Sequence, residues 1–200
     1  MAPCESMRRR PTLWAAGLLL LALAADAASG STSPFRGPAL ITPKPAPDFA
    51  LRDQNGEHVR MSDQRGKVVL LTFLYTHCPD VCPLIAENLN QTLRTLGPAR
   101  GKVRVIAVSV DPEGDTAKSV RHFVRTHHLL PQFHYLTGTP TQLAAVWKSY
   151  GIFVNPEHLD AVDHTAYTAL VDASGKERVL FPSNMRSPAV THDVRYLLNS

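Results

Sequence analysis

The 200-residue chain has only three cysteines, and this scarcity limits what the protein can be. Cys4 lies in the N-terminal segment, so Cys78 and Cys82 form the one pair in the rest of the chain. Two cysteines cannot build the multi-disulfide framework of a small secreted scaffold. They form either one local bridge or a functional site.

The chain also lacks a clustered basic stripe. Its formal net charge is +4, and residues 8–10 form its only run of three arginines. A nucleic-acid-binding domain usually carries its Lys and Arg on one face or along one helix. We therefore expect no nucleic-acid binding.

No apolar run reaches the ~20 residues that a helix needs to span a bilayer. The longest run covers residues 13–25, follows the arginines at 8–10 and ends at Ala25-Asp26-Ala27, which resembles a small-residue cleavage site. This order is typical of a secretory signal peptide. We expect residues 1–28 to be a signal peptide or, if uncleaved, an N-terminal membrane anchor. The protein would then be exported to the periplasm or to the outer face of the cytoplasmic membrane.

The next segment is poor in periodic apolar residues and rich in Pro, Ser and Gly. It covers residues 29–46 and predicts a tether. Residues 47–200 are long enough to form one domain with its own core.

What the chain does contain is a dithiol motif, FLYTHCPDVCP at residues 73–83. It lies where an apolar strand gives way to a helical pattern. Thiols at positions i and i+4 lie on the same side of a helical turn, and a helix N-terminus favours the thiolate. Such a pair exchanges disulfides or holds a soft metal ion.

Alternating strands and helices surround the motif. Asn55 and Gly56 predict a hairpin turn, and residues 172–175 predict a second one. A buried strand at 67–74 is followed by a helix over 84–96, as a thioredoxin-like fold requires. We therefore predict a three-layer α/β domain with a central mixed sheet and an added N-terminal β-hairpin. The further expected elements are strands at 103–110, 133–136, 167–171 and 177–181, and helices over 115–127, 139–150 and 187–198.

Three motifs together resemble the SCO/SenC family of copper-binding assembly proteins for cytochrome c oxidase. They are FLYTHCPDVCP, SVDPEGDT at 109–116 and VDHTAYTALVDASGK at 162–176, in the order and spacing of that family. The resemblance covers residues 47–198. It implies a thioredoxin fold that binds one copper ion through Cys78, Cys82 and His164. The acceptor would be the copper-binding subunit of cytochrome c oxidase or another exported copper protein.

Two thiolates and one imidazole form a soft ligand set that suits trigonal Cu(I) and tolerates Cu(II). A zinc ion held by three protein ligands would keep one open coordination position, so the ligand set does not exclude zinc. In thioredoxin-like reductases, by resemblance, a cis-proline faces the thiols before a late strand. Here no proline lies between Pro156 and Pro182, and Asp163 and His164 take that place. Asp163 either orients His164 or caps a turn, and His77 is at most an auxiliary ligand.

Three functions use the same cysteines. The favoured one is a copper metallochaperone that also reduces the cysteines of its acceptor. The first alternative is an enzyme, a thiol–disulfide oxidoreductase in which Cys78 is the nucleophile and Cys82 the resolving thiol. A peroxidase is disfavoured, because residues 73–78 lack the proline that peroxide-reducing relatives, by resemblance, place before their cysteine.

Overall fold

A six-stranded mixed sheet forms the centre of the computed structural model, which describes residues 33–155 and 163–200. These residues belong to one compact unit, Ser33–Ser200. The strand order is β1-β10-β9-β4-β5-β6. The three strands at one side are parallel and the other pairings are antiparallel. The strands are β1 (Ala39–Pro45), β4 (Val68–Leu74), β5 (Val103–Ser109), β6 (Phe133–Leu136), β9 (Tyr167–Val171) and β10 (Lys176–Pro182).

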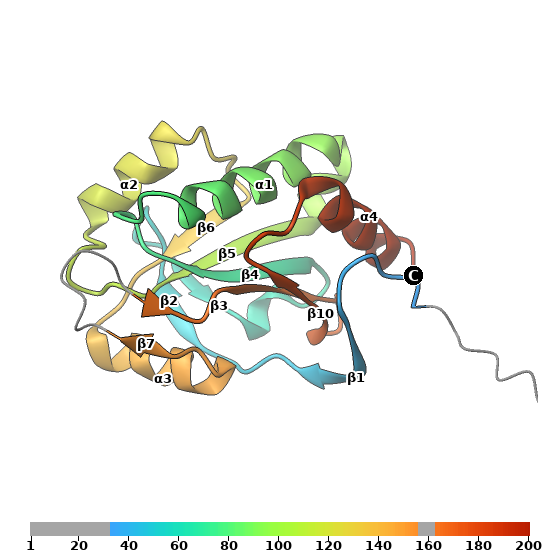
Figure 1. The fold of residues 1–200 in the computed structure, drawn as a ribbon, viewed down its shortest axis with the longest axis horizontal. Helices are drawn as coiled ribbons and strands as arrows, with labels where there is room; N and C mark the ends of the chain where they lie inside the picture. The colour runs from blue at the N-terminus through green and yellow to red at the C-terminus, as the bar shows by residue number, and fades with distance from the viewer. Residues whose placement is uncertain (1–32, 156–162) are drawn as a thin grey trace, which may run out of the picture. The chain divides into compact units, whose positions relative to one another are not determined.

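Helices cover both faces of this sheet. Figure 1 shows α1 (Val81–Thr95) and α4 (Ser187–Leu198) on one face and α3 (Pro140–Tyr150) on the other. All residues of β4 are buried, because apolar side chains from helices on both sides pack against it. The predicted three-layer α/β architecture is therefore confirmed.

Local sequence signals account for the ends of several helices. The second helix in chain order, α2 (Ala117–Thr126), begins after Thr116, whose side chain accepts the backbone N–H of Ser119. Gly151 ends α3 in the left-handed conformation at φ 66°. Only α1 begins earlier than predicted, at Val81. The reason is Pro83, which is tolerated in a first turn because its missing N–H would have no helical partner there.

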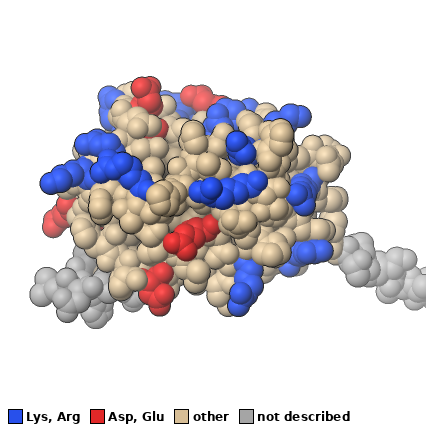
Figure 2. Space-filling view, turned by 90° about the horizontal axis from the view of Figure 1, so that it is seen from above, with Lys and Arg blue, Asp and Glu red and all other residues tan. Residues whose placement is uncertain are grey.

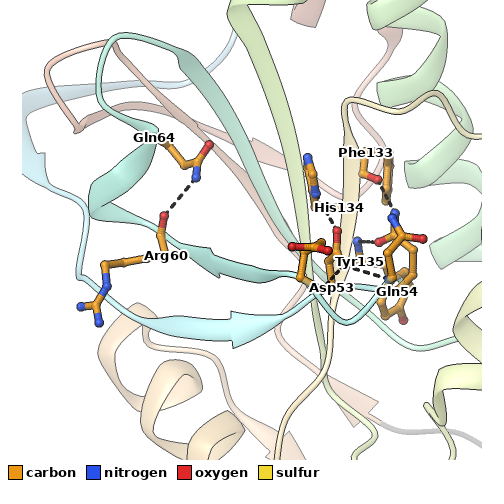
Figure 3. A network of polar contacts seen from close by, with 9 residues as sticks. Asp53, Gln54, Arg60, Gln64, Phe133, His134 and Tyr135 are labelled. Atoms are coloured by element: carbon orange, nitrogen blue, oxygen red, sulfur yellow. Dashed lines mark hydrogen bonds and ion pairs between the residues drawn. The ribbon is translucent and has the colours of Figure 1, made fainter.

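The N-terminal hairpin β2 (Ala50–Arg52) and β3 (His58–Arg60) docks against the outer edge of β6 (Figure 3). The side-chain amide of Gln54 donates to the carbonyl of Phe133 at 3.1 Å and accepts the N–H of Tyr135 at 2.8 Å. Asp53 pairs with His134 at 3.0 Å. Gln54 thus replaces a neighbouring strand, which protects an edge that would otherwise be open to another chain.

The predicted tether is shorter than residues 29–46. Its second half forms β1, which pairs with β10, and the Lys44 ammonium lies 3.2 Å from the buried carboxylate of Glu177. Prolines did not prevent this strand, because β1 lies at the edge of the sheet, where a missing N–H costs no ladder hydrogen bond. The predicted leader lies outside the described residues.

Four short elements complete the described chain. They are the 3-10 helices η1 (Ser62–Gln64) and η2 (Gly97–Lys102) and the paired strands β7 (Val154–Asn155) and β8 (Asp163–His164). Within residues 33–155 and 163–200, no helix combines the length and apolar character needed to cross a membrane.

Candidate metal centre

Both thiols lie where β4 is followed by α1. Cys78 is half-buried in the connecting loop, and Cys82 is buried as the second residue of α1. The backbone N–H of Cys82 donates to the sulfur of Cys78 over 3.3 Å. Both cysteines are free thiols. The predicted convergence of the two sulfurs at a helix start is therefore what the structure shows.

The two thiols differ strongly in acidity. The thiol of Cys82 donates a hydrogen bond to Cys78, and backbone N–H groups of Asp80 and Cys82 add to it, which lowers the pKa of Cys78 to about 5 in spite of partial burial. The same hydrogen bond, together with burial, raises the pKa of Cys82 far above its usual range. At neutral pH the pair thus holds one thiolate and one thiol. The sulfur of Cys78, which is the less buried of the two, is the reactive one.

A buried carboxylate anchors the loop in front of Cys78. Asp115 accepts the backbone N–H of Thr76 at 2.8 Å, and the hydroxyls of Ser109 and Tyr135 donate to its other oxygen at 2.6 and 2.8 Å. Burial raises the pKa of Asp115, while these hydrogen bonds act in the opposite direction. Sequence reasoning treated Asp115 only as the start of a helix. Its position could have indicated this role. Asp115 follows β5 and Thr76 follows β4, and these two parallel neighbours end at the same edge of the sheet.

His164 lies outside the main sheet, in β8, opposite Val154 of β7. Its Nδ1 lies 3.0 Å from the carbonyl of Thr165 and would donate to it, which leaves Nε2 as the ring nitrogen with a lone pair that could bind a metal ion. The ring of Tyr75 meets the imidazole edge to face, with 6.1 Å between centroids and 82° between planes. Tyr75 also donates a hydrogen bond that lowers the pKa of Cys78. One aromatic side chain thus contacts both parts of the predicted site.

The two cysteine side chains are in hydrogen-bond contact with each other, whereas Cys78, Cys82 and His164 do not form a set of ligand atoms within 4.8 Å of one another. Among the described residues, the one set of three potential ligands with atoms within 4.8 Å of one another is His77, Asp111 and Asp115. His77 therefore faces Asp111 and Asp115 of the loop after β5, and its role as an auxiliary ligand stays a prediction. The three-ligand set of Cys78, Cys82 and His164 stays a prediction. The side chain of Asp163 lies outside the described part of the structure.

A dithiol at the junction of β4 and α1, with a low-pKa thiolate and a histidine linked to it through Tyr75, defines a thioredoxin-like protein suited to thiol or soft-metal chemistry. The described residues contain no cis peptide bond, in line with the missing proline before β9. The class of protein follows from these features. The family follows from comparison.

The family model SCO1/SenC matches residues 41–199, and the chain belongs to that family. It is 34% identical over 155 residues to the mitochondrial SCO2 homolog of Bos taurus, covering 74% of this chain and 58% of that protein. It is 30% identical over 135 residues to an SCO2-like protein of Rickettsia conorii, covering 64% of this chain and 65% of the relative. The chain thus spans about two thirds or less of these relatives.

Solved structures agree on the thioredoxin-like fold. Apo Sco1 from Thermus thermophilus superposes with a TM-score of 0.72 at 36% identity, covering 82% of this chain and 96% of that one. Copper-bound ScoI from Bradyrhizobium japonicum superposes with a TM-score of 0.68 at 32% identity, covering 77% and 99%. The predicted fold and family are therefore confirmed.

Proposed function

We propose that this protein is a copper metallochaperone for the copper centre of cytochrome c oxidase. It binds one copper ion through the sulfurs of Cys78 and Cys82 and the Nε2 of His164. The N-terminal segment exports it and keeps it near the membrane. Copper is its cargo, and the acceptor is a copper-binding subunit of the oxidase or another exported copper protein.

The observation that carries the proposal is the unequal pair of thiols, which the side chain of Tyr75 links to His164. Cys78 already holds a thiolate at neutral pH, so Cu(I) meets a soft anionic ligand without prior proton loss. Cys82 must give up its proton when it binds, which makes binding proton-linked. The family also contains a copper-bound structure, that of ScoI from Bradyrhizobium japonicum.

A three-coordinate site suits delivery as well as binding. An incoming thiolate from the acceptor can attack the copper at an open position, and one chaperone ligand then leaves. His164 is the natural leaving ligand, because within the described part of the chain β8 pairs with β7 alone, whereas Cys82 is fixed in α1.

The test is a Cu(I) competition titration of the full chain and two variants. Loss of a group that merely orients a ligand already costs about 10–100-fold in metal affinity, so His164→Ala is expected to cost about 100-fold or more. His77→Ala is the matched control and should bind like the wild type. Equal affinity in His164→Ala and the wild type would overturn the three-ligand proposal.

The acidity difference also favours a second function, reduction of the acceptor's disulfide. The Cys78 thiolate attacks one sulfur of that disulfide, forms a mixed disulfide and releases the other sulfur as a thiolate. Cys82 then loses its proton and attacks the Cys78 sulfur, which releases the acceptor's second sulfur. Two electrons move to the acceptor, and a Cys78–Cys82 disulfide is left.

A reduction assay without copper distinguishes this second function from copper binding. The reduced protein should reduce one equivalent of an acceptor-derived disulfide peptide, and Cys82→Ser should stop at the mixed disulfide. A wild type that leaves the peptide oxidised would exclude reduction. It would leave copper binding intact.

A further inference from the structure

A second candidate site lies far from the thiols, between α1 and α4. An open pocket of about 590 Å³ is lined there by residues of both helices and by the segment that precedes β1. Arg36 and Arg195 bring cationic nitrogen atoms to its wall, and His192, Tyr196 and Gln91 bring further ring, hydroxyl and amide groups that can form hydrogen bonds. No acidic residue is part of this lining. A concave wall of this composition is suited to an oxyanion.

The carboxylate of Asp193 lies outside the lining of the pocket and is already engaged in hydrogen bonds. Asp193 is completely buried and accepts the backbone N–H groups of Arg36 and Gly37 at 2.7 and 2.8 Å. It also lies 2.8 Å from Nδ1 of His192. Asp193 thus fixes the segment and the imidazole that form the wall. Arg36 is exposed, and its guanidinium has no hydrogen bond or ion pair with the residues that the structure describes.

A hydroxyl in the lining also lacks a partner. Thr191 is 4% exposed, and its Oγ1 makes no hydrogen bond among the described residues. A buried hydroxyl without a partner costs free energy, which a bound acceptor atom would recover. Arg195 is partly used, since it donates to the carbonyl of Thr95 at 3.0 Å. It therefore holds α4 against α1 while it faces the pocket.

The charge around the pocket has the same sign. Lys and Arg are prominent on the face of the molecule seen in Figure 2, which carries α1 and α4. On α1, η2, α2 and α4 the exposed acid is Glu87, and the buried Asp193 is the other one. The basic side chains on these helices are Arg94, Arg100, Lys102, Lys118, Arg121, Arg125 and Arg195. Such a face concentrates anions near the pocket.

We propose that the pocket between α1 and α4 binds a phosphate group, either of an anionic phospholipid headgroup or of free phosphate. Guanidinium groups match the geometry of phosphate oxygens. The position of the pocket favours the lipid, because only residues 29–35 separate Arg36 from the predicted leader. A chain of that length spans at most about 25 Å, so a membrane-bound leader would keep the pocket near the headgroups. Bound in this way, α1 and α4 would face the bilayer.

The test uses the full ¹⁵N-labelled chain in phosphatidylcholine nanodiscs and follows the amide signals of Arg36, His192 and Arg195. Inorganic phosphate is titrated in one arm. In the other arm, phosphatidylglycerol replaces part of the phosphatidylcholine. Saturable shifts at these residues are expected in both arms. Shifts with inorganic phosphate alone would assign the site to a soluble phosphate.

Arg36→Gln is the informative variant, because its backbone bond to Asp193 is kept. Loss of one charge-assisted hydrogen bond should weaken the apparent affinity about tenfold. Arg121→Gln on α2 removes the same charge away from the pocket and should change the affinity less than about twofold. Equal weakening in both variants would mean diffuse attraction and overturn the proposal. Unchanged spectra in both arms would overturn it too.

Copper titration separates this proposal from the proposed function. Arg36→Gln should bind Cu(I) like the wild type, because the pocket shares no residue with the thiols or with His164. A variant that loses phosphate binding but keeps copper binding supports the pocket alone.

Discussion

Cys82 and His164 are predicted to bind the same ion but lie in regions of very different construction. Cys82 is 2% exposed and belongs to α1, which packs on the fully buried β4. His164 belongs to a two-residue strand whose one partner among residues 33–155 and 163–200 is the two-residue strand β7. We call the first the thiol region (residues 68–95) and the second the histidine arm (residues 154–155 and 163–164).

This contrast fits the proposed function. Binding requires two sulfurs held at a fixed separation, and the thiol region achieves this with core packing. Delivery requires that a ligand leave, and elements with few buried contacts open at the lowest free energy. A site with one rigid half and one loosely held half meets both requirements.

The largest expected effect tests whether the thiol region is indispensable. Cys78→Ser replaces the soft thiolate by a hydroxyl, which is a poor ligand for Cu(I) and is neutral at pH 7. We expect stoichiometric Cu(I) binding to be lost in a competition titration in which His164→Ala still binds measurably. If His164→Ala lost binding and Cys78→Ser kept it, the ranking of the two regions would be wrong.

Stability should show the same contrast. Leu89→Ala in α1 removes a completely buried side chain and should lower the free energy of unfolding by about 2–5 kcal/mol. Phe153→Ala, next to β7, truncates a side chain that is 66% exposed and should cost less than about 0.5 kcal/mol. Urea unfolding followed by circular dichroism measures both. Similar losses in the two variants would contradict the contrast.

The acidity of Cys78 offers a pH-dependent test. Since its pKa is about 5, iodoacetamide alkylation of the copper-free protein should be constant above about pH 6 and fall as the pH drops through 5. Cys82→Ala removes the hydrogen-bond donor, so the midpoint should move upward toward the ordinary thiol value. Mass spectrometry of the modified peptide follows the rate at Cys78. A wild-type midpoint near 8.5 would contradict the pairing.

The same ionisation contributes to stability with a defined sign. Folding lowers the pKa of Cys78 from 9.0 to about 5, so its contribution is complete above about pH 9 and is lost as the pH falls through 5. Folding raises the pKa of Cys82, so this thiol destabilises the fold only where the unfolded thiol ionises, near pH 9 and above. Comparison of Cys78→Ser with the wild type across this window isolates the first contribution.

Sequence patterns predicted most of the fold because its elements carry local signals. The apolar run of β4, the Asn55 and Gly56 turn and the Gly151 cap each depend on neighbouring residues alone. The i, i+4 spacing of Cys78 and Cys82 belongs to the same category. The strand β1 carried no such signal, because an edge position and a distant partner, Glu177, decide its pairing.

Part of the site could not be predicted from sequence patterns, because it depends on contacts between residues far apart in the chain. Asp115 holds Thr76 across 39 positions of the chain, and its partner Tyr135 lies 20 positions further on. Neither spacing has a local signature. The pocket between α1 and α4 likewise joins Arg36 to Arg195, which only the folded chain brings together.

The smallest expected effect concerns Tyr75, the residue that contacts both regions. Its ring meets the His164 imidazole, and its hydrogen bond favours the Cys78 thiolate. An edge-to-face ring contact contributes about 0.5–1.5 kcal/mol, so Tyr75→Leu should weaken Cu(I) affinity by several-fold, within about tenfold. Tyr75→Phe keeps the ring and loses only the hydroxyl. It should therefore keep most of the affinity while raising the alkylation midpoint of Cys78. If both variants changed affinity and midpoint together, Tyr75 would act only through the thiolate, and the histidine arm would take its position from elsewhere.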